Sequence, residues 1–180
     1  MKNNSNIVNN TENKAENKMK PVPLALSIAV PLIIGGASAI ITGDMMKDFF
    51  FMNKPPLAPP GWVFPVVWTI LYVMMGLAFY LVVDSGKDWA LVVKSIIFYF
   101  VQLMLNFFWP ILFFKGSLYL WAFIELLAML TTIIITTVLF FKTSKHAGLL
   151  MIPYIVWTSF AAYLNIAVYV LSITPMILPR

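Results

Sequence analysis

Five long apolar segments separated by polar connections limit what this chain can fold into. They run over Pro21–Thr42, Trp62–Val83, Trp89–Phe114, Leu118–Phe141 and Gly148–Ile173. A helix needs about 20 apolar residues to cross the ~30 Å hydrocarbon core of a bilayer, and each segment is long enough. The 180 residues are 61% hydrophobic and only 11% charged, which is too little polar surface for a water-soluble domain of this length. The sequence therefore predicts an all-α integral membrane protein, a bundle of five transmembrane helices.

Two further segments stand out by composition. Residues 1–20 are polar and Asn-rich with little to bury, so we interpret them as a disordered tail before a membrane domain over residues 21–175. Residues 43–61 form the longest predicted connection between helices, whereas the other connections are short. Short connections predict that neighbouring helices pack antiparallel in one bundle. Small residues at 35–39 of the first segment predict a close contact with another helix.

The stretch Asn53–Tyr72 joins a proline-rich half to an aromatic helical half. Its first half contains Pro55, Pro56, Pro59 and Pro60, which fix φ and remove four backbone donors. That half is therefore expected to be extended or turned, and stiff. Its second half repeats large rings at helical spacing, at Trp62, Pro65, Trp68 and Tyr72. Two interpretations remain open: a lid over a pocket, or a connecting loop followed by interfacial aromatic residues.

The lysines predict an orientation for the bundle. With five helices, one side of the membrane receives Lys2, Lys14, Lys18, Lys20, Lys87, Lys142 and Lys145, and the other receives Lys47, Lys54, Lys115 and Arg180. Because cytoplasmic loops carry the excess of basic residues, the N-terminus is expected in the cytoplasm and the long first connection outside. The net charge of +5 thus indicates topology and contact with lipid headgroups rather than nucleic acid.

Little in the sequence points to metal, thiol or cofactor chemistry. The chain has no cysteine, and its single histidine, His146, lies in a short basic loop. No cluster of His and carboxylate residues has the spacing of a metal site. The sequence therefore predicts neither a metal nor a bound cofactor.

Glu125 is the one acidic residue deep inside an apolar segment. A carboxylate within a membrane is costly, so it is expected to face a partner, a cavity or water. The candidate partners are Gln102, Asn106 and Asn165. Glu125 is either a polar anchor or proton-linked switch at a ligand site, or a hydrogen-bonded side chain that ties helices together.

Tryptophans supply the second signal. They lie within or at the ends of apolar segments at Trp62, Trp68, Trp109, Trp121 and Trp157. Trp68 and Trp157 lie furthest from the helix ends, where interfacial tryptophans concentrate. Indoles from different helices that face inward would form a flat aromatic cavity suited to a large planar apolar molecule. Pro110 and Pro153 can kink their helices beside such a cavity.

These residues resemble the motifs of the TspO family, the tryptophan-rich sensory proteins of bacteria and the mitochondrial translocator protein. The likeness covers about residues 35–170. It rests on four groups of motifs in order along the chain. They are Lys54-Pro55 with Pro59-Pro60-Gly61-Trp62-Val63-Phe64-Pro65; Trp68-Thr69-Ile70-Leu71-Tyr72 with Met75-Gly76; Gln102, Asn106, Trp109-Pro110, Trp121 and Glu125; and Pro153-Tyr154, Trp157, Phe160-Ala161 and Tyr163-Leu164-Asn165.

The resemblance implies five transmembrane helices, a homodimer, and a pocket under the first connection. It implies ligands such as protoporphyrin, haem, isoquinoline carboxamides and benzodiazepines, bound by a receptor or translocator. It also implies, as an alternative, light- and oxygen-dependent degradation of porphyrin with Trp68 and Trp157 as the reacting residues; a ligand-responsive sensor or lipid-binding protein is a third possibility. The ligand-binding positions that the motifs carry over are Phe64, Trp68, Tyr72, Asn106, Trp109, Trp121, Glu125, Trp157, Phe160, Ala161, Leu164 and Asn165.

The chain departs from the family pattern at three places. Leu57 stands where many members have a tryptophan, so the expected lid has one aromatic ring fewer. The animal proteins end their fifth helix with a cholesterol motif, but here no basic residue follows Tyr169 until Arg180. The small-residue pattern used for dimer packing by some members is missing from Ser95–Leu105.

Overall fold

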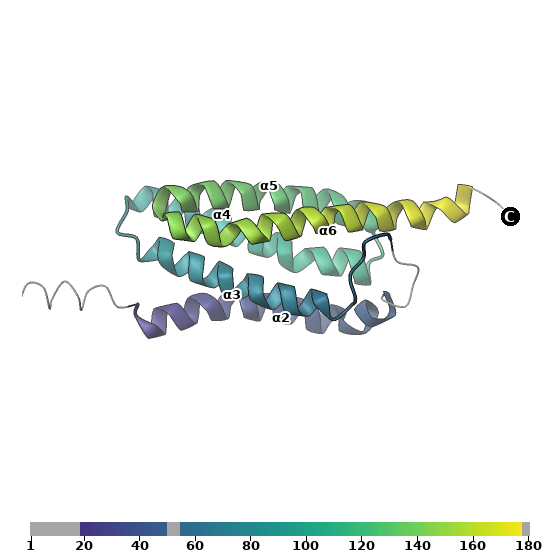
Figure 1. Cartoon of the computed structure of the whole chain (residues 1–180), viewed down its shortest axis with the longest axis horizontal. Coiled ribbons are helices and arrows are strands. Elements are labelled where there is room, and N and C mark those ends of the chain that lie inside the picture. The colour runs from purple at the N-terminus through teal and green to yellow at the C-terminus, as the bar shows by residue number, and fades with distance from the viewer. Residues whose placement is uncertain (1–18, 50–54, 178–180) are drawn as a thin grey trace, which may run out of the picture.

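The computed structural model describes residues 19–49 and 55–177, and these residues form a helical bundle (Figure 1). Its elements in chain order are α2 (Pro21–Phe49), α3 (Val63–Val83), α4 (Trp89–Pro110), the π-helical turn η1 (Ile111–Lys115), α5 (Tyr119–Thr143) and α6 (Lys145–Ile177). Over these residues, five helices are long and apolar enough to cross a membrane. The prediction of an all-α five-helix membrane protein is confirmed.

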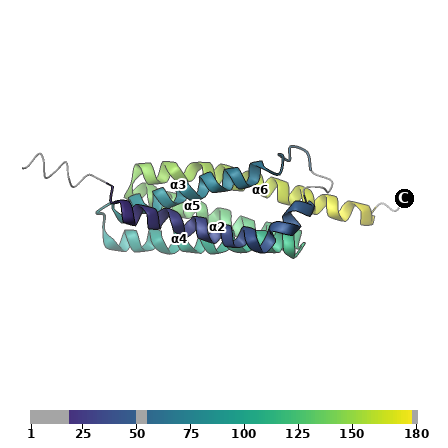
Figure 2. The same ribbon diagram turned by 90° about the horizontal axis from the view of Figure 1, so that it is seen from below.

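The helices pack as two layers joined by short connections. α2 lies against α3, and α5 packs against both α4 and α6. α3 connects the two sets through α6, and α2 also meets α4 and η1. Successive helices run in opposite directions, so α2 begins at one end of the bundle and α6 finishes at the other (Figures 1 and 2). The proline-rich segment after α2 lies at the end where α6 finishes, and it approaches that helix (Figure 1).

The first helix is longer than predicted. Sequence analysis placed its end at Thr42, but α2 continues to Phe49, so the connection predicted over residues 43–61 is correspondingly shorter. Gly43 did not stop the helix because an interior glycine costs only about 1 kcal/mol relative to alanine. Methionines at 45 and 46 favour helix, which helps to offset that cost.

The last two helices meet in a turn that is also tighter than predicted. Only Ser144 separates α5 from α6, whereas the sequence indicated a connection over Lys142–Ala147. The backbone N–H of Ser144 donates to the carbonyl of Phe140 at 2.7 Å, and its own carbonyl accepts from Gly148 at 3.1 Å. A Cβ on Gly148 would overlap the ring of Phe141, so this close turn requires glycine.

A second glycine sets the spacing between α2 and α3. A Cβ on Gly76 would collide with the backbone of Ser27 and Ile28, so the two helices approach at nearly backbone contact. Close approach at small residues is how membrane helices gain van der Waals packing. Deeper in the bundle, the ring of Tyr99 stacks on Phe79 at 4.7 Å and on Phe140 at 5.9 Å between centroids. This stack ties α3, α4 and α5 together.

The expected distortion at Pro110 takes the form of a π-turn. Proline has no N–H to donate to the carbonyl one turn earlier, and the helix widens directly after it. The N–H of Gly116 donates to the carbonyl of Ile111 at 2.9 Å, the five-residue spacing of a π-helix. Such turns occur often at functional sites, and this one borders both cavities described below.

Candidate ligand-binding site

A cavity of about 200 Å³ lies among α2, α3, α4 and η1. Aromatic and small residues form most of its wall, and few polar atoms reach it. The lining side chains from α3, α4 and η1 are Phe64, Pro65, Trp68, Thr69, Tyr72, Asn106, Trp109, Pro110 and Phe114. Those from α2 are Leu32, Gly35, Gly36, Ser38, Ala39 and Thr42.

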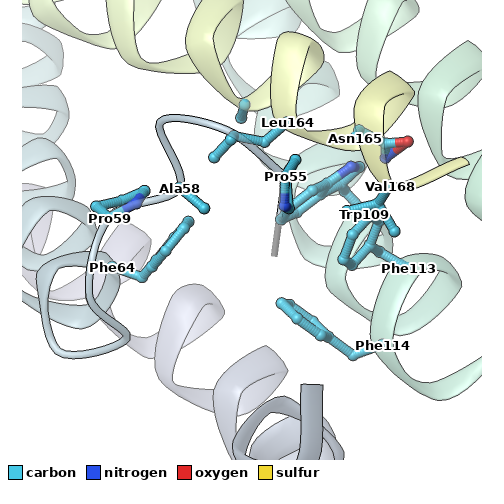
Figure 3. A pocket seen from close by; sticks show the side chains of 11 residues that line it. Pro55, Ala58, Pro59, Phe64, Trp109, Phe113, Phe114, Leu164, Asn165 and Val168 are labelled. Atoms are coloured by element: carbon cyan, nitrogen blue, oxygen red, sulfur yellow. The ribbon is translucent and has the colours of Figure 1, made fainter. Parts of the chain in front are cut away.

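A smaller cavity of about 40 Å³ lies directly under the proline-rich segment (Figure 3). We call residues 55–61 the strap. Pro55, Ala58 and Pro59 of the strap form one wall of this cavity, and the opposite wall comes from α4, η1 and α6. The two cavities share the side chains of Phe64, Trp109 and Phe114, so these rings form a common wall.

The strap is fastened to α6 by a hydrogen bond. The Tyr163 hydroxyl donates to the carbonyl of Pro56 at 3.1 Å. The next residue, Leu57, has a φ of 66°, a left-handed conformation that is unfavourable for a non-glycine side chain. Pro55 is buried while the Leu57 side chain is 80% exposed, so the strap turns one proline inward over the cavity and leucine outward.

The larger cavity opens toward the outer surface of the bundle. Gly36 and Ala39 of α2 and Pro65 and Thr69 of α3 line it, and all four residues are also exposed. These residues lie in membrane-spanning segments, so the surface on which the cavity opens faces the bilayer.

A chain of hydrogen bonds crosses the bundle beside the larger cavity. The Tyr72 hydroxyl donates to Asn106 Oδ1 at 2.7 Å, and Asn106 Nδ2 donates to the Tyr154 hydroxyl at 3.0 Å. The Tyr154 hydroxyl in turn points at the sulfur of Met129 at 3.8 Å. Helices α3, α4, α5 and α6 each contribute one group, so this chain fixes the position of Tyr72 and Asn106 on the cavity wall.

Two polar groups on the wall of the smaller cavity have no hydrogen-bond partner within the described part of the chain. They are the indole N–H of Trp109 and the side-chain amide of Asn165, both buried. Leaving a buried polar group unpaired costs about 1–3 kcal/mol. A ligand atom placed between them could accept from both and recover part of that cost.

The two predicted reacting tryptophans occupy different environments. Trp68 lines the larger cavity, stacks on Tyr72 at 5.6 Å and meets Tyr154 edge-on at 6.0 Å. Trp157 lines neither cavity and lies behind Phe64, which it meets edge-on at 5.7 Å. Phe160 packs against Trp157 at 5.7 Å and belongs to the same outer layer.

Glu125 and Trp121 stand apart from both cavities. The Trp121 side chain is 63% exposed on the outer face of α5. Both Glu125 carboxyl oxygens are buried, yet within the described residues neither has a hydrogen-bond partner. The contacts expected with Gln102, Asn106 and Asn165 are therefore not formed. Gln102 instead donates to the sulfur of Met75 at 3.7 Å, and Asn106 belongs to the tyrosine chain.

The structure brings eight of the predicted ligand-binding residues to the cavity walls. They are Phe64, Trp68, Tyr72, Asn106, Trp109, Ala161, Leu164 and Asn165. Sequence analysis missed the contributions of η1 and α2. Pro110 signalled a distortion but not that it would turn Phe113 and Phe114 to the cavities. The small residues of α2 predicted a close contact with another helix, and Gly35 indeed abuts the Tyr72 ring. Nothing in the sequence indicated that α2 would also form a wall of the cavity.

Five helices long and apolar enough to cross a membrane, with aromatic cavities between them, define a class: an integral membrane protein with apolar cavities in its helical bundle. Comparison with known proteins specifies it further. The model of the TspO/MBR family matches residues 27–171, and the chain belongs to this family.

Known relatives are similar in sequence to this chain over most of their length. The chain is 36% identical to the tryptophan-rich protein TspO of Chlorobaculum tepidum, over 83% of this chain and 95% of that protein. It is also 36% identical to the tryptophan-rich protein TspO of Archaeoglobus fulgidus, over 86% of this chain and 99% of that one. The human translocator protein is 34% identical over 73% of this chain and 79% of its own length.

Proposed function

We propose that the protein is a membrane receptor or translocator that binds tetrapyrroles, such as protoporphyrin and haem, in the cavity beneath the strap and in the larger cavity that shares its aromatic wall. The observation that carries this proposal is the composition of the shared wall. The rings of Phe64, Trp109 and Phe114 border both cavities. Trp109 and Asn165, whose N–H and side-chain amide have no partner among the described residues, both line the smaller cavity. A tetrapyrrole such as protoporphyrin is a flat apolar ring with acidic side chains. Its ring can lie against the aromatic wall, and its acidic groups can accept hydrogen bonds from Trp109 and Asn165.

The size of the cavities requires the site to adjust. Pockets for drug-sized ligands commonly enclose about 300–1,000 Å³, whereas the larger cavity here encloses about 200 Å³ and the smaller about 40 Å³. Rotation of the shared rings would join the two cavities, and an outward shift of the strap would enlarge the smaller one. We propose that the ligand enters from the membrane between α2 and α3 and that the strap closes over its polar edge.

The resemblance also implies isoquinoline and benzodiazepine ligands and a homodimer, and these remain proposals. A planar drug of that kind needs less room than a tetrapyrrole and fits the same aromatic wall. The carbonyl oxygen of such a drug would then accept hydrogen bonds from the indole N–H of Trp109 and the side-chain amide of Asn165.

The proposal is tested by comparing two ligands on two proteins. Protoporphyrin IX carries two carboxylates, and its dimethyl ester carries none. The native protein is expected to prefer the free acid, and Asn165→Leu is expected to reduce that preference by about tenfold or more, because one hydrogen bond to a charged group contributes about 1.5–3 kcal/mol. Thr131→Ala, at an exposed site on α5, is the control. Equal affinities for acid and ester in the native protein would contradict the assigned role of Trp109 and Asn165.

A further inference from the structure

A second hollow lies far from the aromatic cavities, at the end of the bundle where α2 and α6 begin. It is an open groove of about 450 Å³ lined by Met19, Leu77, Leu81, His146, Leu149 and Leu150. It shares no residue with the cavity beneath the strap or with the larger aromatic cavity. Its volume lies within the range of about 300–1,000 Å³ that is common for ligand-binding clefts. The groove is therefore large enough for part of an extended molecule.

The floor and walls of this groove are apolar. Five of its six lining residues are methionine or leucine, and each of them is at least partly exposed. Leu77 and Leu81 belong to the span of α3, and Leu149 and Leu150 to the span of α6. The groove consequently lies on the part of the surface that meets lipid, near the level where the helices leave the membrane.

The rim of the groove is basic. His146 lines it directly, and Lys145 lies one turn before Leu149 on the same face of α6. Lys20 is held at the opposite rim because its backbone N–H donates to the Tyr80 hydroxyl at 2.9 Å.

The acidic residues described at this end are Asp84 and Asp88, both in the connection between α3 and α4. The Asp88 carboxylate accepts from the N–H of Leu91 at 3.3 Å, so it serves as the N-cap of α4. No acidic residue lines the groove itself. Among the residues that the structure describes, the positive charge at the rim is therefore opposed only from the neighbouring connection.

We infer that this groove binds one anionic phospholipid, with an acyl chain along the leucines and the phosphate at Lys20, Lys145 and His146. An apolar groove under a basic rim complements an amphiphile with a negative head. The assignment also agrees with the expected orientation, because the lysine-rich end lies at the cytoplasmic leaflet, where anionic lipids attract basic residues. A free phosphate ion would satisfy the rim but leave the apolar groove unused.

The test is native mass spectrometry of the full-length protein with phosphatidylglycerol and phosphatidylcholine of identical acyl chains. One phosphatidylglycerol is expected to be retained preferentially. The double variant Lys20→Gln/Lys145→Gln should lower its relative affinity by about fivefold or more, because each lysine near a membrane surface attracts anionic lipid. Lys115→Gln, an exposed lysine at the other end of the bundle, is the matched control and should change nothing.

Two further measurements identify the occupant. Leu149→Trp should fill the groove and lower retention of both lipids, and excess inorganic phosphate should fail to displace phosphatidylglycerol. Equal retention of the two lipids, equal loss with Lys115→Gln, or displacement by phosphate would overturn the proposal. So would a gain in lipid retention on deleting residues 1–18, because the groove would then belong to the chain's own N-terminal segment. Unchanged binding of protoporphyrin by these variants shows that they are folded.

Discussion

Single residues decide how closely the helices around the larger cavity approach. Gly35 abuts the ring of Tyr72, and that ring carries the hydroxyl that donates to Asn106. A methyl group at position 35 must push the ring away, which breaks the hydrogen bond and moves one wall of the cavity. Residue 35 therefore links helix packing to the shape of the larger cavity.

We expect Gly35→Ala to weaken protoporphyrin binding about tenfold and to lower the free energy of unfolding by about 1–3 kcal/mol, as overpacking does. Gly43→Ala is the control on the same helix, because its added Cβ meets open space and alanine favours helix. Fluorescence titration and thermal unfolding in detergent measure the two effects. If both variants bind alike, the Tyr72 ring moves without consequence for the ligand.

The two tryptophans differ in their access to a ligand, and this difference tests the photochemical alternative. Trp68 lines the larger cavity, while Phe64 stands between Trp157 and the cavities. If an indole reacts with an illuminated porphyrin, Trp68→Phe should abolish bleaching and keep most of the binding, because phenylalanine retains a flat apolar face. Trp157→Phe should slow bleaching much less.

Bleaching rate and affinity are measured on the same preparations, in the dark and in light. If Trp68→Phe loses affinity and bleaching in parallel, Trp68 only forms part of the cavity wall and does not react. Bleaching that depends more on Trp157 would show that the Phe64 ring turns aside when ligand binds.

At the scale of elements, the strap combines a stiff, proline-rich sequence with a hydrogen bond to α6. Its prolines limit the chain entropy lost on closing, and Tyr163 holds it through the carbonyl of Pro56. Replacing Pro59 and Pro60 with glycine should weaken binding while the helical content stays the same. If the affinity of that variant is unchanged, the strap only connects α2 to α3 and does not contribute to ligand binding.

The fastening itself can be tested separately from stiffness. Tyr163→Phe removes the hydrogen bond to Pro56 and should speed ligand dissociation about two- to tenfold, the effect of losing about 0.5–1.5 kcal/mol. Stopped-flow displacement of protoporphyrin measures the rate. Tyr169→Phe, on the same helix, leaves the Tyr163–Pro56 bond in place and serves as the control; equal dissociation rates in all three proteins would show that the strap does not gate release.

The elements also show which features of the site can be predicted from sequence. Apolar length defines the five spans because a bilayer leaves the backbone few alternatives to a helix. Helix ends were less predictable: Gly43 costs too little to stop α2, and a glycine at 148 permits a turn with Ser144 alone. The orientation of Phe113 and Phe114 depends on the π-turn after Pro110, and hydrogen bonds of that kind leave no periodic pattern in the sequence.

At the scale of the whole molecule, the predicted partners of Glu125 show where sequence alone falls short. Three buried amides were available, but which groups meet depends on the rotation of each helix about its axis. That rotation is set by many weak contacts, such as the Phe79–Tyr99–Phe140 stack and the approach of Gly76 to Ile28. The distribution of lysines among the connections, in contrast, predicts the orientation of the bundle without knowledge of how each helix is rotated.

Orientation in the membrane is the last prediction. Lys115 ends η1, just before α5 begins, and Lys142 lies in the last turn of α5; both are exposed. The excess of lysines at the end that carries Lys142 predicts that this end is cytoplasmic and that the strap faces outward. Because the chain has no cysteine, single-cysteine variants at these two positions report the topology without further changes.

In intact bacterial cells, a membrane-impermeant maleimide should label Lys115→Cys, and it should label Lys142→Cys only after the cells are opened. If only Lys142→Cys is labelled from outside, the bundle has the opposite orientation, and the basic groove lies in the outer leaflet. Equal labelling of both variants in intact cells would mean that the population has two orientations. In that case the lysine asymmetry is too weak to orient the protein, because the bias depends mainly on residues close to the membrane.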